Sequence, residues 1–183
     1  MIKLTTIDQV KSAFQKEKKI GENMMKMKKT TWHIKKNVLN YNISRGGQMK
    51  RIAHISDTHI RNLKYHDEYR HVFNEIYDSL KQEQPDYIVH TGDLAHTKTQ
   101  LSPEYFEMAS NFLKSLADIA PTIMILGNHD GNLKNGDRQD AVTPIIEALN
   151  HPNFTLLKDS GEYSPEPGLT FNVLSVFDRE NWR

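Results

Sequence analysis

The chain has 183 residues, of which 37% are hydrophobic and 26% are charged, a composition typical of one soluble globular domain or two small ones. It contains no cysteine, so disulfides and thiolate metal sites are excluded, and any metal would be held by Asp, His, Asn or Glu. No apolar run approaches the roughly 20 residues that cross a bilayer, and the first residues lack the pattern of a signal peptide. We therefore expect a soluble intracellular protein that does not bind a membrane.

Charge is distributed unevenly along the chain, although the formal net charge is only +1. Residues 1–51 hold 13 Lys and Arg against 3 Asp and Glu, whereas residues 52–183 hold 11 against 20. Such a basic segment is typical of an arm that contacts nucleic acid, and equally of a solvated tail. Met49 looks like a natural protein start. We expect residues 1–48 to be a basic N-terminal extension, or even an upstream extension of the reading frame, and residues 49–183 to form the domain.

The predicted elements alternate between strands and helices. The first part of the chain has a helical pattern over 7–20 and a strand pattern near 32–34 or 38–41. Further strands are predicted over 52–59, 87–90, 122–126, 154–157 and 169–177, with a turn-rich connection over 159–168. Further helices are predicted over 67–82, 102–119 and 137–149. Strands joined by helices of this length form parallel βαβ units, so the sequence predicts an α/β fold.

Polar side chains follow three of these strands at the point where each strand ends. Asp57 and His59 follow the first strand, Asp93 follows the second after a glycine, and the run 128–130 (Asn-His-Asp) follows the third after another glycine. The carboxyl ends of parallel strands form one edge of a sheet, where α/β proteins place their sites. A mixed Asp, His and Asn set suits two divalent ions, Mn²⁺, Fe, Zn²⁺ or Co²⁺, which together clamp the oxygens of a phosphoryl displacement.

Each motif alone also fits an ordinary structural role. An Asp at a strand end is usually a turn or helix cap, and Gly-Asp alone carries little information. The histidines within strands, His54 and His90, are expected to be packed in the core. All three motifs in this order, each after a strand and separated by helices, favour the metal site over chance.

The segment from Ile52 to Asp130, with its three motifs, resembles the calcineurin-like metallophosphoesterase superfamily. The resemblance implies a double β-sandwich flanked by helices, in α-β-β-α layers, with two metal ions in the site. It implies four metal ligands, with the third bridging both ions: Asp57, His59, Asp93 and Asn128. It also implies that His129, oriented by Asp130, contacts the scissile phosphate or protonates the leaving oxygen.

The run Gly92-Asp93-Leu94-Ala95-His96 is similar to a motif of SbcD-type nucleases, the nuclease subunits of double-strand-break repair complexes, and of phage recombination endonucleases. Ala95 stands where those proteins have Phe. The resemblance implies that His96 is a second histidine facing the phosphate. It further implies Mn²⁺-dependent exonuclease and endonuclease activity on DNA, a homodimer, an SMC-like ATPase partner, and a location in the cytoplasm, or in the host cytoplasm for a viral protein.

The sequence departs from the family pattern after Asp130. The family completes its site with a later His and a Gly-His-x-His motif, and neither occurs here, since the last histidine is His151. We therefore expect only the N-terminal part of the fold. Two other functions stay open: a phosphatase or small-molecule phosphodiesterase of the same superfamily, and a non-catalytic fragment that binds DNA or a partner through its basic arm. Three cations near the first motif could contact DNA phosphates or simply be solvated: Arg61, Lys64 and Arg70.

Overall fold

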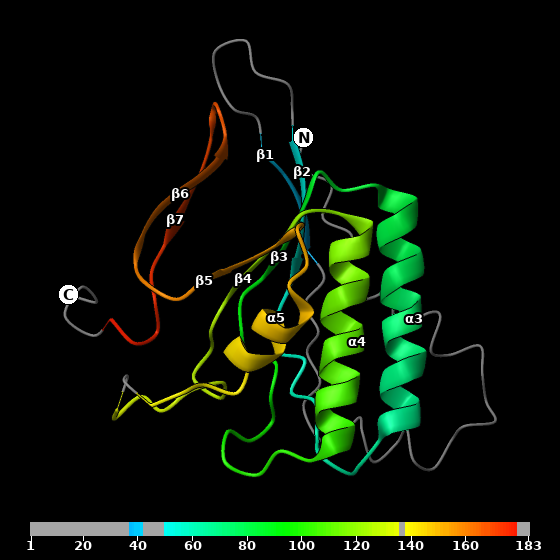
Figure 1. Cartoon of the computed structure of the whole chain (residues 1–183). Helices are drawn as coiled ribbons and strands as arrows, with labels where there is room; N and C mark the ends of the chain where they lie inside the picture. The colour runs from blue at the N-terminus through cyan, green and yellow to red at the C-terminus, as the bar shows by residue number, and fades with distance from the viewer. Residues whose placement is uncertain (1–36, 42–49, 136–137, 179–183) are drawn as a thin grey trace.

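The computed structural model describes residues 37–41, 50–135 and 138–178 (Figure 1). The predicted helix over 7–20 and the alternative strand at 32–34 lie outside these ranges. In chain order the elements are β1 (Asn37–Tyr41), β2 (Lys50–Ile55), α3 (His66–Glu83), β3 (Tyr87–His90), α4 (Pro103–Ile119), β4 (Thr122–Ile125), α5 (Thr143–Leu149), β5 (Phe154–Leu157), β6 (Gly161–Glu166) and β7 (Leu169–Val173).

Five strands form one sheet in the order β1-β2-β3-β4-β5. Strands β2 to β5 run parallel, and β1 pairs antiparallel with β2 at the edge. Strand β1 comes from the segment expected to be an N-terminal extension. Because the strand order advances in one direction and βαβ crossovers are right-handed, the connecting helices fall on the same face of the sheet. Figure 1 shows α3, α4 and α5 together on that face.

A hairpin of β6 and β7 covers part of the opposite face of the sheet (Figure 1). Leu169 of the hairpin is buried against Ile52, Tyr87 and Ile123 of three sheet strands, with Phe171 packed beside them. The described residues therefore form three layers: helices, a mostly parallel sheet and a hairpin. This architecture confirms the predicted α/β fold with flanking helices.

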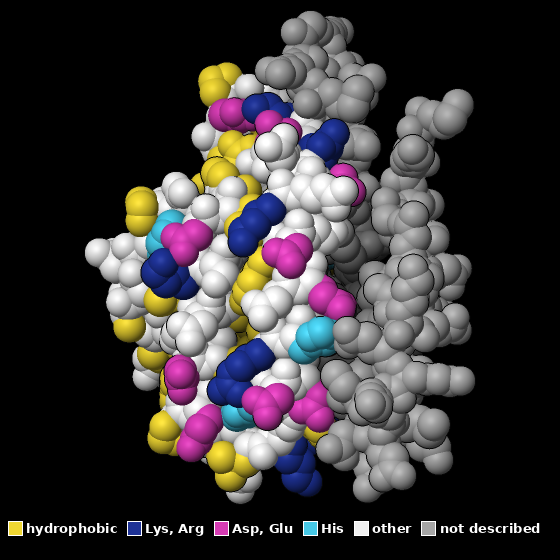
Figure 2. All heavy atoms as spheres, turned by 90° about the vertical axis from the view of Figure 1, so that its right-hand side faces the viewer, with side chains coloured by type: hydrophobic (Ala, Val, Ile, Leu, Met, Phe, Trp, Pro, Cys, Tyr) yellow, Lys and Arg dark blue, Asp and Glu magenta, His cyan; other side chains and the backbone are white. Residues whose placement is uncertain are grey.

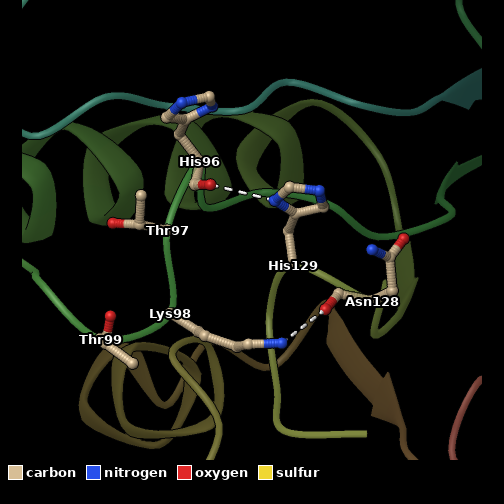
Figure 3. Close-up of a pocket in the computed structure, with 6 residues that line it drawn as sticks. All are labelled: His96, Thr97, Lys98, Thr99, Asn128 and His129. Atoms are coloured by element: carbon tan, nitrogen blue, oxygen red, sulfur yellow. Dashed lines mark hydrogen bonds between the residues drawn. The ribbon is translucent and has the colours of Figure 1, made fainter.

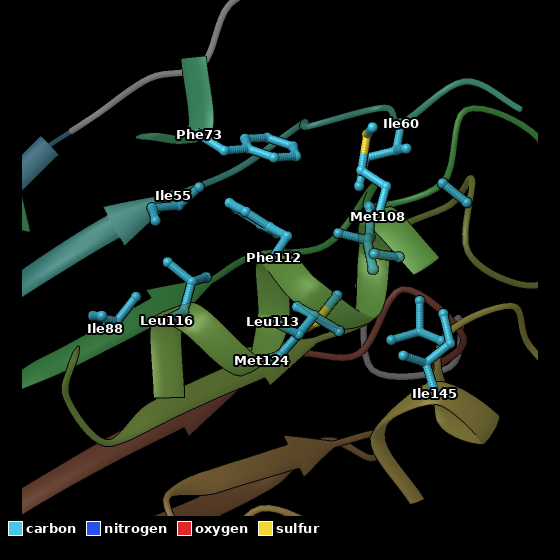
Figure 4. Close-up of a cluster of buried hydrophobic side chains, with 14 of the residues drawn as sticks. Ile55, Ile60, Phe73, Ile88, Met108, Phe112, Leu113, Leu116, Met124 and Ile145 are labelled. Atoms are coloured by element: carbon cyan, nitrogen blue, oxygen red, sulfur yellow. The ribbon is translucent and has the colours of Figure 1, made fainter. Parts of the chain in front are cut away.

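The main core lies between the sheet and helices α3 and α4 (Figure 4). Phe73 of α3 stacks on Phe112 of α4 with ring centroids 4.2 Å apart, and both rings belong to one buried cluster with Ile55 and Ile88 of the sheet. Burying an aromatic or aliphatic side chain of this size stabilises the fold by roughly 1.5–3 kcal/mol. The core thus gives the loops at the carboxyl ends of β2, β3 and β4 a rigid base.

Several element boundaries differ from the sequence prediction: β2 ends at Ile55 rather than 59, and β7 ends at Val173 rather than 177. Helix α5 begins at Thr143 rather than near 137, because the Asp140 carboxylate accepts hydrogen bonds from the backbone N–H groups of Val142 and Thr143 and Pro144 occupies the first turn. The connection over 159–168, predicted as turn-rich, contains the strand β6.

The outer surface of the helices carries interspersed basic and acidic side chains (Figure 2). Some of them form ion pairs along the helices, such as Arg70 with Asp67 at 2.9 Å and Lys114 with Asp118 at 2.7 Å. In the part of the chain that the structure describes, no helix is both long enough and apolar enough to cross a membrane.

Candidate metal centre

The backbone beyond β2 and β3 continues as two paired segments that carry the first predicted ligands. The N–H groups of Asp57 and His59 donate to the carbonyl oxygens of Gly92 and Asp93 at 3.2 and 2.9 Å. Asp57, His59 and Asp93 all have left-handed backbone conformations, with φ of 57°, 44° and 56°. Such values are uncommon outside glycine. The chain therefore leaves the regular strand conformation at these three positions, and their side chains converge.

Two glycines let the ends of β3 and β4 approach each other. A Cβ atom on Gly92 would lie 2.2 Å from the backbone nitrogen of Gly127. A Cβ atom on Gly127 would lie 2.2 Å from Oδ1 of Asp93. Gly92 also has φ of 91°, which other residues rarely adopt. The glycines before the second and third motifs are therefore required by the close backbone contact that brings the two loops together.

Imidazole and carboxylate atoms gather at this point at spacings that suit a divalent ion. His59 Nε2 lies 3.7 Å from Asp57 Oδ1 and 3.8 Å from Asp93 Oδ2, too far for hydrogen bonds. Ligand atoms of His59, Asp93 and His129 all lie within 4.8 Å of one another. This nitrogen and oxygen set, without thiolates, fits a divalent ion such as Mn²⁺, Fe, Zn²⁺ or Co²⁺.

The buried side chain of Asp130 connects the loop that follows β3 to the loop that follows β4. Its carboxylate is fully buried and accepts three backbone hydrogen bonds, from Asp93 and Gly127 at 2.8 Å and from Ala95 at 3.0 Å. Burial raises the pKa of Asp130 to about 6, and the three N–H donors oppose that rise by stabilising the charged form. Asp130 therefore fixes the backbone position of Asp93, the predicted bridging ligand.

The ring of His129 has a different partner from the one that the resemblance implies. His129 Nδ1 lies 3.0 Å from the carbonyl oxygen of His96, and a carbonyl only accepts, so Nδ1 carries the proton (Figure 3). The backbone N–H of His129 donates to Asp93 Oδ1 at 2.8 Å. Asp130 contacts backbone groups, whereas the His96 carbonyl sets the tautomer of the His129 ring. This tautomer leaves Nε2 of His129 with an available lone pair.

His96 and His129 line a pocket of about 380 Å³ beside the ligand cluster, together with Asn128 and the run 97–99 (Figure 3). Burial, followed by the charge of Arg61, lowers the pKa of His96, so its ring is neutral at pH 7. Lys98 Nζ donates to the backbone carbonyl of Asn128 at 3.3 Å. Sequence reasoning assigned no role to the run 97–99. The sequence signal that could have indicated a role is the run Thr97-Lys98-Thr99 directly after His96, in which a cation stands between two hydroxyl side chains.

The structure brings all seven predicted site residues to one edge of the sheet: Asp57, His59, Asp93, His96, Asn128, His129 and Asp130. Two of the three cations that the sequence suggested as DNA contacts do not take part in this cluster. Arg70 forms an ion pair with Asp67 on α3, and Lys64 is exposed. His90 is fully buried, as predicted for a packed histidine.

Comparison with known proteins identifies the class to which this arrangement belongs. Residues 50–181 match the family model described as calcineurin-like phosphoesterase. The chain belongs to the calcineurin-like phosphoesterase family, whose members are hydrolases that bind divalent metals. The predicted superfamily is thereby confirmed.

Particular relatives come from a virus and from archaea. The chain is 48% identical over 135 residues to protein R555 of Acanthamoeba polyphaga mimivirus, which covers 72% of this chain and 10% of that protein. It is 32% identical over 94 residues to the DNA double-strand break repair protein Mre11 of Saccharolobus solfataricus, covering 48% of this chain and 24% of that protein. The Mre11 of Thermoplasma acidophilum is 32% identical over 89 residues, 46% of this chain and 24% of that protein. The chain thus spans between a tenth and a quarter of the length of these relatives.

Proposed function

We propose that this site is a two-metal phosphodiesterase centre that cleaves DNA during recombination and double-strand-break repair. The observation that carries the proposal is the convergence of His59, Asp93 and His129 within 4.8 Å at the carboxyl edge of the sheet, with Asp57 adjoining. The similarity to two archaeal repair proteins supports DNA as the substrate.

In this proposal the ligands divide between two metal positions. Asp57, His59 and Asp93 would hold the first ion, and Asp93 with Asn128 would hold the second. Asp93 Oδ1 accepts the His129 N–H and keeps a further lone pair, while Oδ2 faces His59, so both oxygens can reach an ion. When bound, the two ions, most simply Mn²⁺, would polarise the scissile phosphate and activate a water molecule for attack.

The protein's own groups then act on the phosphate and the leaving oxygen. His129 keeps its Nδ1 proton on the His96 carbonyl, so its Nε2 is free to take up a second proton, and in that form it can donate a hydrogen bond to the phosphate or a proton to the leaving oxygen. The ring of His96 is a second phosphate contact from the same pocket. Asp130 acts as a positioning residue, because it holds the backbone of Asp93 rather than any reacting atom.

The partner predictions continue as proposals alongside this activity. We propose a homodimer that works with an SMC-like ATPase, and a basic segment over 1–48 that adds affinity for DNA. The viral relative supports a host-cell cytoplasm as the location. Light scattering of the purified chain, with and without residues 1–36, a deletion that keeps β1 in the sheet, would test the oligomeric state directly.

The decisive experiment is Mn²⁺-dependent cleavage of linear DNA by the wild-type chain, Asp93→Asn and Asp118→Asn. Asp118 is an exposed acid of α4 that pairs with Lys114, so its replacement controls for the loss of one carboxylate. We expect cleavage by the wild type and Asp118→Asn and a loss of at least 100-fold in Asp93→Asn.

The other two functions predict different results in the same assay. Hydrolysis of bis(4-nitrophenyl) phosphate without cleavage of DNA would favour the phosphatase or small-molecule phosphodiesterase. If neither substrate is hydrolysed while DNA binding is lost on deletion of residues 1–36, which leaves β1 in place, the chain is a binding fragment. Either result would overturn the nuclease proposal.

A further inference from the structure

Arg61 and Lys98, two cations at the rim of the site, have no acidic partner among the described residues, as is also true of exposed cations away from the site such as Lys64 and Lys81. Lys50 pairs with Glu166, Lys158 with Asp140, and Lys114 and Arg70 with acids on their own helices. By contrast, no carboxylate among the described residues lies within ion-pair distance of Arg61 or Lys98. Their charges are therefore available to an anion from solution.

Arg61 stands immediately beside the predicted catalytic histidines. The backbone N–H of His96 donates to the carbonyl of Ile60 at 3.0 Å, so the residue after Ile60 is adjacent to His96. The Arg61 side chain is partly buried, and its Nε atom is enclosed without a hydrogen-bond partner among the described residues. A buried N–H donor without a partner costs roughly 1–3 kcal/mol, a cost that an incoming acceptor would remove.

Lys98 stands on the opposite loop, at the mouth of the pocket (Figure 3). Among the described residues its hydrogen-bond partner is the neutral backbone carbonyl of Asn128, which leaves two of its three N–H donors and its charge available. Figure 3 shows the side chain reaching from the run 97–99 toward the loop of Asn128 and His129. The hydrogen bond to Asn128 thus places the Lys98 ammonium group in the lining of the pocket.

The loops that carry Arg61 and Lys98 are joined to each other by hydrogen bonds. Asn62 donates from its side chain to the carbonyl of Gln100, and its own carbonyl accepts from Ser102 Oγ at 2.8 Å. Thr97 Oγ1 also donates to the Gln100 carbonyl, at 3.1 Å. Loops that are already ordered lose little conformational freedom when a ligand binds.

We propose that Arg61 and Lys98 form a cradle for a second phosphate of the nucleic-acid strand whose neighbouring phosphate lies in the metal centre. This inference rests on the proposed function and deepens it, because it assigns the site to polyphosphodiester substrates rather than to monoesters. Lys98 and His96 line a pocket of about 380 Å³, which lies in the range of ligand sites and exceeds the volume of one phosphate group, and Arg61 follows Ile60, whose carbonyl accepts the His96 N–H. Arg supplies a planar fork of donors and Lys a point charge, the two usual phosphate contacts.

The test compares Arg61→Gln and Lys98→Gln with Lys81→Gln as the matched control. Glutamine keeps an N–H donor but removes the charge, so the Lys98→Gln side chain can still donate to the Asn128 carbonyl. Lys81 is exposed in the last turn of α3, about 22 Å along the helix from its first turn beside the site. Binding of a labelled 20-nucleotide single strand is measured in EDTA as a function of salt concentration.

We expect each rim variant to bind the strand about tenfold more weakly than the wild type and to lower the salt slope by roughly 0.7, the value for one phosphate contact on single-stranded DNA. With Mn²⁺, the ratio of kcat/KM for the oligonucleotide to kcat/KM for bis(4-nitrophenyl) phosphate should fall about tenfold, chiefly through KM. Lys81→Gln should match the wild type in all three measurements.

The outcomes separate failure of the cradle from failure of the nuclease. Rim variants whose salt slope and substrate ratio equal those of Lys81→Gln overturn the cradle, even if the wild type cleaves DNA. A wild type that cleaves neither substrate, but whose salt slope falls in both rim variants, retains the cradle and overturns the proposed activity. An equal loss of activity on both substrates with an unchanged slope shows a structural role and also overturns the cradle.

Discussion

Gly92 and Gly127 contact each other backbone to backbone, so that a Cβ atom on the first would lie 2.2 Å from the nitrogen of the second. This contact joins the loops that follow β3 and β4, and it places Asp93 Oδ1 against the backbone N–H of His129. The geometry of the proposed bridging ligand thus depends on the absence of two side chains.

Gly127→Ala is therefore expected to destabilise the fold and to disrupt metal binding. The new methyl group would lie 2.2 Å from Asp93 Oδ1, and relieving such overpacking typically costs about 1–3 kcal/mol. We expect urea unfolding to show a free energy of unfolding lower by that amount. We also expect isothermal titration to show at least tenfold weaker Mn²⁺ binding. Gly168→Ala is the control: its φ of 85° makes alanine strained, but nothing lies within 4 Å, so stability should fall while Mn²⁺ binding is retained. Equal Mn²⁺ affinity in both variants would contradict the claim that the close approach at Gly127 positions Asp93 for metal binding.

Asp130→Asn should lower stability although it preserves shape and removes a buried charge. The carboxylate accepts N–H groups from Asp93, Gly127 and Ala95, and an amide would present a donor to at least one of them. A buried donor left without a partner costs about 1–3 kcal/mol. We expect a decrease of that size in the free energy of unfolding, against less than 0.5 kcal/mol for the exposed Asp118→Asn. If the urea midpoint of unfolding were the same in Asp130→Asn and the wild type, Asp130 would not stabilise the loops through these hydrogen bonds.

Tyr69→Phe should weaken metal binding from a position that touches no ligand atom. The Tyr69 hydroxyl donates to the backbone carbonyl of His59 at 2.6 Å and so holds the loop that presents this ligand. Groups that orient metal ligands usually contribute 10- to 100-fold to affinity. We expect Mn²⁺ affinity to fall about tenfold, measured by titration, and Tyr77→Phe on the same helix to leave it unchanged. Equal affinities in the two variants would be evidence against this support.

His90 should make the fold less stable in acid. Burial lowers its pKa from 6.5 to about 3, so between these values the unfolded chain binds a proton that the folded chain does not. Its contribution to stability is complete above pH 6.5 and is lost as the pH falls toward 3. Between pH 7.5 and 4.5 this loss amounts to roughly 2–3 kcal/mol, at about 1.4 kcal/mol per pH unit below 6.5.

His90→Asn provides the comparison for this acid sensitivity. The asparagine oxygen replaces Nδ1, which accepts the N–H of Gly92 at 3.2 Å, but it cannot titrate. Urea unfolding at pH 7.5 and 4.5 should show a stability difference that is about 2–3 kcal/mol smaller in the variant than in the wild type. The same pH dependence in both proteins would show that His90 is not the group responsible.

Local pattern was sufficient to predict the elements that make the main core. The stripe that includes Phe73, and the Ser102 cap with its hydrogen bond from the Tyr105 N–H, predict α3 and α4 within a residue or two of their observed bounds. The strand β6 was missed because Gly161 and Pro165 are turn signals. Packing of the hairpin against the sheet overrides them, with a register shift next to Pro165.

The site was predictable as a set of residues but not as a geometry. A ligand at a strand end is visible in sequence, whereas the left-handed backbone at His59 depends on contacts made after folding. The same is true of Asp130, whose partners are backbone groups up to 37 residues away, and of the His96 carbonyl that holds the His129 ring. Backbone acceptors and donors carry no sequence signature.

The left-handed conformations of Asp57, His59 and Asp93 have a consequence for how this protein can evolve. Each costs roughly 1–2 kcal/mol for a residue with a side chain, and glycine would remove that cost. Selection for heat tolerance alone is therefore expected to enrich glycine at these three positions before most others. Variants that survive such a selection would be more stable but inactive, because three of the positions where glycine removes backbone strain are the proposed metal ligands. Maintaining the ligands requires continuous selection for activity.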